Sequence, residues 1–286
     1  MKPGKASRTA FRVAIRRAAH QIADQPPIMH DPVAVRLVGA DAKRDLERAM
    51  HKVARDFRCL MVARSRYAED RLADSFVQGV RQYVVLGAGL DTFAYRNPFA
   101  ALHVFEVDFP ATQEWKREVL AEAGIPLPEN LVFVPLDFER QTLTDGLRAA
   151  GVDMFAPAFF SWLGVVPFLT LDALRATLAA IAQFPEGSAV TFDYALPPEA
   201  LSPERRAVFT RLASRLAASG EPYRLFFTPE QIEAELTTTG FHRSEHVDFE
   251  GLNERYFQNR ADGLKLSPAL SGMLTTAWVR PLITNH

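Results

Sequence analysis

The chain has 286 residues, of which 48% are hydrophobic and 23% charged, and its 33 lysines and arginines nearly balance 34 acidic residues. This composition excludes a disordered or fibrous chain and allows a sizeable core. The net charge of −1 gives no electrostatic reason to expect nucleic acid or a membrane as partner. A single cysteine, Cys59, excludes an internal disulfide, so we expect a reducing, cytoplasmic location.

The first 79 residues are expected to be helical, with an interruption at Asp31-Pro32. The basic stretch from Lys2 to Arg17 lacks the apolar run of a secretory signal, so it is interpreted as an amphipathic helix. Residues 58–78 space their apolar side chains three and four positions apart. That spacing predicts an amphipathic helix packed on the body of the protein.

Short apolar runs then alternate with helical segments. Five runs are predicted to be strands: 82–86, 102–107, 131–134, 158–162 and 189–194. Helices are expected between several of them, at 110–123 and at 171–183. Strands that alternate with helices indicate βαβ units, and continuous apolar strands indicate a parallel sheet covered on both faces.

The alternation pauses after Tyr194. A turn-rich link leads to an amphipathic helix over 204–219, and Thr228-Pro229 is expected to begin another helix. Two last strands are predicted at 241–249 and 275–279. We therefore expect one fused domain, divided into a helical N-terminal cap (1–79), an α/β core (80–195), a helical lid insertion (196–230) and the rest of the sheet (231–286).

The strongest local motif is Val84-Val-Leu-Gly-Ala-Gly-Leu-Asp-Thr92. Glycine after a strand permits a tight turn with unusual φ and lets a ligand approach the backbone, so Gly87 and Gly89 are candidate cofactor contacts. A dinucleotide fingerprint would need a third glycine or alanine where Thr92 stands. A pyrophosphate-containing cofactor such as NAD(P) is therefore disfavoured, although an NAD(P)-dependent oxidoreductase remains the alternative.

Two acids follow at the ends of the next strands. Asp108 comes about 20 residues after the glycine turn, where doubly wound folds place an acid on ribose hydroxyls. A carboxylate suits this role because it accepts from two hydroxyls at once. After the third strand, Asp137-Phe138 can bind an adenine amino group and pack on its ring.

Taken together, these motifs resemble the leucine carboxyl methyltransferase family, in its bacterial S-adenosyl-L-methionine-dependent branch. The resemblance covers residues 7 to about 195 in the right order. It is carried by Ser7-Arg-Thr-Ala10, Asp31-Pro32, Ala63-Arg64, Leu86-Gly-Ala-Gly-Leu-Asp-Thr92 with Arg96, Phe105-Glu-Val-Asp-Phe-Pro110 and Leu136-Asp-Phe138. It implies a class I methyltransferase fold, a Rossmann-like α/β sheet that is doubly wound, with seven strands of which one is antiparallel.

The resemblance also implies a site for S-adenosyl-L-methionine. Arg64 and Arg8 would meet the methionine carboxylate, where a guanidinium fork suits a carboxylate. Asp108 would hold the ribose, and Asp137 and Phe138 would contact the adenine. After the fourth strand, Leu163 stands where the family carries an acid and Phe168 where it carries a tyrosine. We place Leu163 beside the cofactor and Phe168 beside the substrate.

The methyl acceptor is less defined. Family members that methylate a protein C-terminus have an arginine where Glu139 stands, and an acid would repel a carboxylate there. We expect an O-methyltransferase acting on a small molecule; a degenerate homologue that binds cofactor or a partner without catalysis is a third hypothesis. No motif names a general base, and nothing indicates an oligomer. Arg255 and Tyr256 are candidate substrate contacts.

The segment His242-Arg-Ser-Glu-His246 matches the letters of a zinc peptidase motif. That motif requires a helix, whereas the alternation of Phe241, Val247 and Phe249 with polar residues predicts a strand. In a strand the two histidines would lie about 13 Å apart, too far to share an ion. We therefore predict no metal site.

Overall fold

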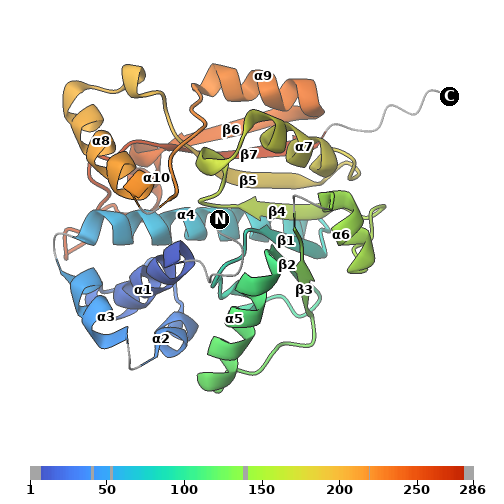
Figure 1. The fold of residues 1–286 in the computed structure, drawn as a ribbon, viewed down its shortest axis with the longest axis horizontal. Coiled ribbons are helices and arrows are strands. Elements are labelled where there is room, and N and C mark those ends of the chain that lie inside the picture. The colour runs from blue at the N-terminus through green and yellow to red at the C-terminus, as the bar shows by residue number, and fades with distance from the viewer. Residues whose placement is uncertain (1–7, 40–41, 52–53, 138–140, 219, 280–286) are drawn as a thin grey trace.

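The computed structural model describes residues 8–39, 42–51, 54–137, 141–218 and 220–279 (Figure 1). Its centre is a seven-stranded sheet in the order β3-β2-β1-β4-β5-β7-β6. The strands are β1 (Gln82–Leu86), β2 (His103–Asp108), β3 (Leu131–Pro135), β4 (Ala158–Trp162), β5 (Ala189–Tyr194), β6 (Phe241–Asp248) and β7 (Met273–Val279). All seven lie within one or two residues of the apolar runs that predicted them.

The first five strands are parallel, and β7 is antiparallel to both β5 and β6. This confirms the predicted doubly wound sheet with one antiparallel strand. The strand order reverses at β1, which pairs with β2 on one side and β4 on the other. In such sheets ligands bind outside the carboxyl ends of the strands at this reversal.

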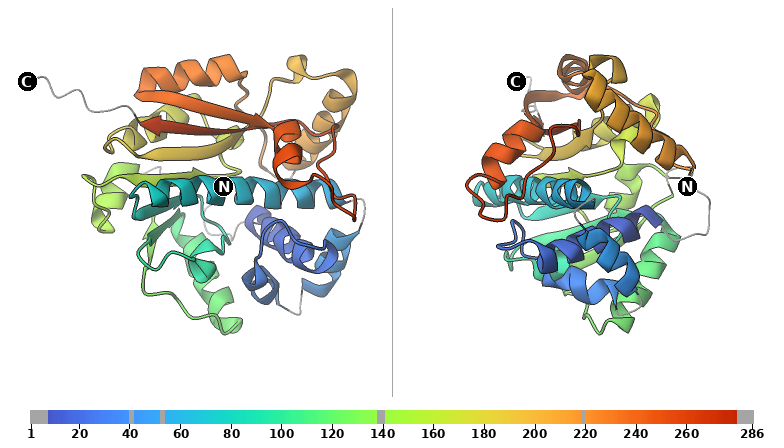
Figure 2. Two further views of the ribbon diagram at one scale, coloured as in Figure 1. Left: turned by 180° about the vertical axis from the view of Figure 1, so that it is seen from behind. Right: turned by 90° about the vertical axis from the view of Figure 1, so that its left-hand side faces the viewer.

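Helices cover both faces of the sheet (Figures 1 and 2). In Figure 1, α4 lies behind the strands and α6 and α7 in front of them. The helices are α1 (Arg8–Ala23), α2 (Pro32–Val38), α3 (Lys43–Met50), α4 (Arg55–Val77), α5 (Pro110–Glu122), α6 (Leu143–Ala149), α7 (Leu171–Ile181), α8 (Pro203–Ala218), α9 (Pro229–Thr239) and α10 (Phe249–Tyr256).

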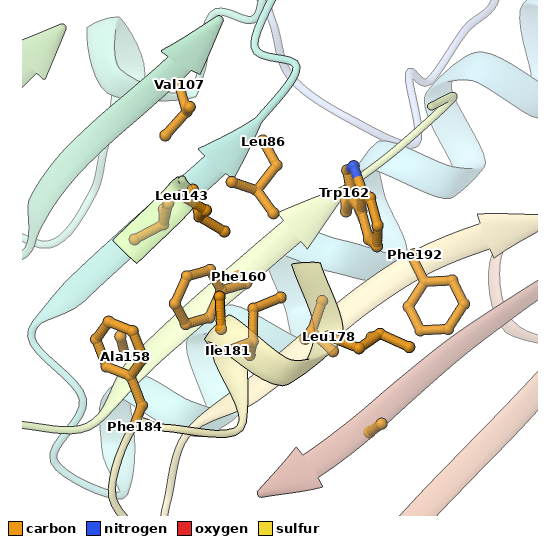
Figure 3. Close-up of a cluster of buried hydrophobic side chains, with 14 of the residues drawn as sticks. Leu86, Val107, Leu143, Ala158, Phe160, Trp162, Leu178, Ile181, Phe184 and Phe192 are labelled. Atoms are coloured by element: carbon orange, nitrogen blue, oxygen red, sulfur yellow. The ribbon is translucent and has the colours of Figure 1, made fainter. Parts of the chain in front are cut away.

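The main core lies between the sheet and helices α6, α7 and α9. Figure 3 shows part of it, with Phe160 and Phe192 from the strands facing Leu178 and Ile181 of α7. Phe160 also meets Phe184 edge to face, with ring centroids 5.0 Å apart. Burial of such large aromatic and branched side chains fixes the sheet against its helices, so the carboxyl ends of the strands form a rigid platform.

Two sets of helices lie beyond that platform. α1, α2 and α3 pack together through a separate buried cluster that includes Ile15, Ala18 and Leu37. α8 lies across the first half of α4 from them (Figure 1). Unlike the other long helices, α8 has no buried residue along its described length. Its apolar side chains are therefore available to line a space rather than to fill a core.

Several local predictions are confirmed. Asp31 caps α2 and Pro32 begins it, while Thr228 and Gln231 form a capping box with Pro229 at the start of α9. The segment with His242 and His246 is strand β6. Within the described ranges, no helix is long and apolar enough to cross a membrane.

Candidate functional site

Two cavities open at the carboxyl ends of the strands. The first, which we call the loop cavity, has a volume of about 1350 Å³ and follows the glycine turn after β1, Asp108 and the residues after β4. The second, the helical cavity, has a volume of about 1070 Å³ and lies between α1, α4 and α8. Both are lined by Thr9, Val13, Arg64, Gly164 and Phe168. Ligands in the two cavities would therefore be neighbours.

The glycine turn is tightly packed as well as conformationally special. Gly87 and Gly89 have φ of 68° and 48°, in the left-handed region that favours glycine. A Cβ on Gly87 would lie 2.7 Å from Val165 Cγ2, and one on Gly89 would lie 2.9 Å from Ala10 Cβ. The turn thus needs glycine for backbone shape and for close contact with the segment after β4 and with α1.

Asp108, at the end of β2, is 7% exposed and faces the loop cavity. One carboxylate oxygen accepts from the Gly89 amide at 2.6 Å and the other from the Phe109 amide at 2.7 Å. Burial raises the pKa of Asp108, and these two amides oppose the rise. Each oxygen retains a further lone pair, so the carboxylate can still accept from two hydroxyl groups.

A buried polar network of side chains supports the glycine turn. The Arg17 guanidinium donates to Asp31 (2.9 Å), Asp91 (2.8 Å) and Thr92 (2.8 Å), and the Thr92 hydroxyl donates to Asp31. Burial raises the pKa of Asp91, but Arg17, Lys116 and Arg96 outweigh it and lower that pKa to about 2. Thr92, where a dinucleotide fingerprint has a small residue, is thus a fully buried hydrogen-bonding residue.

A second buried pair links the turn to α5. Lys116 donates to Glu106 (2.5 Å) and to the Asp91 carbonyl (2.7 Å), and both side chains are 1% exposed. Burial raises the pKa of Glu106 to about 7 against the opposing effect of Lys116. The other Glu106 oxygen, Oε1, has no hydrogen-bond partner among the described residues. This pair lies behind the turn rather than facing the cavity.

Arg64 stands where the two cavities meet. Its Nη1 lies 3.2 Å from Asp193 at the end of β5, and the other Asp193 oxygen accepts from the Gly164 amide. Gly164 has φ of 71°, and a Cβ there would lie 2.9 Å from the Arg64 guanidinium. Arg64 Nε is buried without a hydrogen-bond partner in the described part of the chain. An unused guanidinium N–H fits a ligand carboxylate.

The structure brings together most of the predicted site residues. Gly87, Gly89, Asp108, Asp137, Leu163 and Arg64 line the loop cavity, and Phe168 lines both cavities. Arg8 begins α1, but its side chain lies outside the described residues, as does Phe138.

Arg255 and Tyr256 lie elsewhere. Neither lines either of the two cavities. The Tyr256 hydroxyl donates to Asp70 at 2.7 Å, and Arg255 stands 5.5 Å from the centre of the Tyr67 ring. The cavity geometry therefore gives no support to the substrate role predicted for this pair.

Two features of the site were missed in the sequence. The Arg17 network joins residues from 14 to 75 positions apart, so no local spacing reveals it. Asp193 sits at a strand end like Asp108, a weak signal that could have pointed to it. The roles of Arg17 and Asp193 become visible only from the residues that they contact in the fold.

Comparison with known proteins identifies the family of this chain. Residues 10–182 match the leucine carboxyl methyltransferase family. A Bacillus subtilis protein named "Putative S-adenosyl-L-methionine-dependent methyltransferase YktD" is 32% identical over 92% of this chain and 95% of its own length. The Mycobacterium tuberculosis relative Rv1896c, of the same printed description, is 35% identical over 60% of this chain and 58% of its own.

Among solved structures, a Streptomyces avermitilis protein of the DUF574 family superposes with a TM-score of 0.57 at 17% identity, covering 93% of this chain and 97% of that one. That likeness supports the fold alone. The sequence matches decide between the cofactors considered above, in favour of S-adenosyl-L-methionine over NAD(P). The chain therefore belongs to the leucine carboxyl methyltransferase family and is an S-adenosyl-L-methionine-dependent methyltransferase.

Proposed function

We propose that this enzyme transfers a methyl group from S-adenosyl-L-methionine in the loop cavity to an oxygen atom of a small molecule in the helical cavity. The observation that carries this proposal is the meeting of the two cavities at Arg64, Gly164 and Phe168. A donor and an acceptor must be adjacent for direct transfer, and this is the place where occupants of the two cavities would touch.

The proposed cofactor contacts follow from the donor set. Gly87 and Gly89 let the backbone approach the cofactor, and Asp108 keeps two lone pairs for the ribose hydroxyls. Arg64 offers its unused Nε–H to the methionine carboxylate while Asp193 holds its Nη1. Asp137 and Leu163 line the same cavity, and Arg8 and Phe138 belong to this proposal as sequence predictions.

The bound cofactor supplies an electrophilic methyl group on a positively charged sulfur. The chain contributes alignment and exclusion of water, which can provide much of the rate in an in-line displacement. Phe168 stacks on Tyr223 with ring centroids 5.1 Å apart, and Tyr223 stacks on Phe209 of α8 at 5.3 Å. This aromatic stack runs from the place where the cavities meet, at Phe168, along the helical cavity, and we propose that it helps to exclude water there.

The acceptor is proposed to be a small molecule, without nucleic acid or membrane involvement, and the reaction is proposed to occur in the cytoplasm. The chain's near-zero net charge supports the absence of a polyanionic partner. The helical cavity of about 1070 Å³ is large enough for a metabolite, at the upper end of the usual range for ligand pockets.

Calorimetric titration with S-adenosyl-L-methionine tests the site. We expect Asp108→Ala and Arg64→Ala to weaken binding at least about tenfold, because each removes charge-assisted hydrogen bonds. Arg66→Ala is a matched control, because Arg66 lies on the same helix and pairs with Asp70 at its surface. Unchanged affinity in both site variants would refute the assignment. Binding without any turnover across an oxygen-acceptor panel would favour the degenerate-homologue alternative.

A further inference from the structure

The helical cavity has an apolar interior. Phe57, Leu60 and Met61 of α4 form one wall, and Val208, Phe209 and Leu212 of α8 form the opposite one. These α8 side chains are only half-buried, and Val208 alone among them packs at the edge of a hydrophobic cluster. Apolar surface that lines a cavity instead of a core is stabilised when an apolar ligand covers it.

The same cavity carries an excess of positive charge. Six arginines line it, from α1, α3, α4 and α8, against the acids Glu47 and Asp193: Arg12, Arg16, Arg44, Arg48, Arg64 and Arg215. Asp193 already pairs with Arg64. Within the described residues, no carboxylate lies at ion-pair distance from Arg12, Arg16, Arg44 or Arg215. The positive charge of this cavity is thus largely uncompensated by the chain itself.

Arg16 shows this most clearly. It is half-buried, stands 5.7 Å from the centre of the Phe57 ring, and among the described residues donates only to the backbone carbonyl of Arg12. Burial lowers its pKa, and the charges of Arg12 and Arg64 lower it further. A cation that is partly desolvated among other cations gains most from an anion placed beside it.

The position of Arg16 indicates how far along α4 a bound anion would lie from Arg64. Phe57, over which it lies, precedes Arg64 by about two turns of α4, which corresponds to about 10 Å along the helix axis. An anion held beside the Phe57 ring would therefore be displaced by about 10 Å along α4 from Arg64, where the cavities meet, with Leu60 and Met61 of the cavity wall between. It would be too far from the donor cavity to be the group that is methylated.

We propose that the acceptor is an anionic amphiphile: an acidic group held by Arg12 and Arg16, an apolar body about 10 Å long against α4 and α8, and a methyl-accepting oxygen near Arg64. This inference rests on the proposed function, because it assigns the substrate class of the same site. The acid is an anchor that orients the substrate and is not the methyl acceptor.

Calorimetry with matched ligands tests the proposal on the full chain. The probes are decanoate, decanol, decyltrimethylammonium and acetate, titrated with S-adenosylhomocysteine present. We expect decanoate to bind at least about tenfold more tightly than each of the others, because only decanoate offers both the apolar body and the negative charge. Equal affinity for decanoate and decanol would overturn the role of the arginines, and equal affinity for decanoate and acetate would overturn the apolar body.

Two variants locate the anion. Arg16→Gln and Arg12→Gln should each reduce the preference for decanoate over decanol by about tenfold and leave decanol binding unchanged. Arg211→Gln is the control, because Arg211 lies on α8 but lines neither cavity. Unchanged preference in both variants would overturn the proposal. The affinity for S-adenosylhomocysteine is measured first, because a variant that binds this ligand is folded. If the wild-type chain does not bind S-adenosylhomocysteine, the proposed function is refuted instead.

Discussion

The loop cavity and the helical cavity are built in different ways. The loop cavity is walled by backbone and by side chains that already have partners: Asp108 accepts from two amides, and Asp91 accepts from Arg17. The helical cavity is walled by half-buried apolar side chains and by six arginines, four of which have no acidic partner among the described residues. A preorganised cavity suits a ligand that is always the same, whereas a cavity whose charges lack partners needs its ligand to balance them.

This difference explains where the sequence was informative. The strands, the glycine turn and Asp108 are signalled by local runs and by a spacing of about 20 residues, because βαβ units repeat the same geometry. The walls of the helical cavity come mainly from α1, α3, α4 and α8, whose contacts are set by tertiary packing. Their surface arginines look like solvated charges in the sequence, and only the fold shows that Arg16 lies over Phe57.

The expectation for Arg255 and Tyr256 of α10, which the cavity geometry does not support, has the same origin. Polar residues on a helix indicate an accessible face but not which neighbour they meet. In the fold, Tyr256 finds Asp70 on α4 and Arg255 finds the Tyr67 ring, both far along the sequence. The Arg17 network was missed for the same reason.

The strongest test of the preorganised loop cavity is Arg17→Met. This change removes the cation that pairs directly with both buried acids and leaves Asp31 only Arg96 at 3.5 Å, so we expect the free energy of unfolding to fall by about 3–5 kcal/mol. Chemical denaturation measures the change. Arg12→Met, on the same helix, removes an exposed arginine and should change stability by less than about 0.5 kcal/mol. Similar losses of stability in both variants would mean that the Arg17 network contributes no more to stability than an exposed arginine does.

The buried Glu106 predicts a dependence on pH. Its pKa, raised by burial to about 7, lies above the ordinary value, so its contribution to stability is present below about pH 4.5 and is lost as the pH rises through 7. We expect wild type to lose up to about 3 kcal/mol relative to Glu106→Gln between these limits. Denaturation of both proteins from pH 4.5 to 8 measures the difference, in which other titrations cancel. A constant difference would show that Lys116 keeps Glu106 ionised throughout.

Close packing of the glycine turn can be separated from backbone strain. Gly87→Ala and Gly124→Ala both force a Cβ onto a left-handed residue, with φ of 68° and 63°, at about 1–2 kcal/mol each. Only Gly87 has a neighbour in the way, Val165 at 2.7 Å, whereas the space around Gly124 is open. Gly87→Ala should therefore lose more stability and also weaken S-adenosyl-L-methionine binding. If the two variants lost the same stability and the same affinity for S-adenosyl-L-methionine, the requirement for glycine at position 87 would come from φ alone.

The smallest expected effect concerns the contact that links the two regions. The Thr9 hydroxyl, at the start of α1, donates to Glu221 in the segment after α8, and the Arg224 amide of that segment donates to the Pro167 carbonyl at 2.7 Å. Thr9→Val removes one hydrogen bond, about 1 kcal/mol, so the Arg224 amide should exchange with solvent about fivefold faster. Hydrogen exchange measures this rate.

Thr238→Val is the control for that change, because the Thr238 hydroxyl donates only to a carbonyl of its own helix. The two cavities differ in how far they are organised before a ligand binds. Loss of the Thr9–Glu221 hydrogen bond should therefore affect only one of the two cavities. Glu221 and Arg224 line the loop cavity, and Tyr223 between them lines the helical cavity. Faster exchange at Arg224 with unchanged affinity for S-adenosyl-L-methionine would show that the segment contributes to the helical cavity alone. A parallel loss of cofactor affinity would instead show that the segment also closes the loop cavity, and that the two regions are organised together.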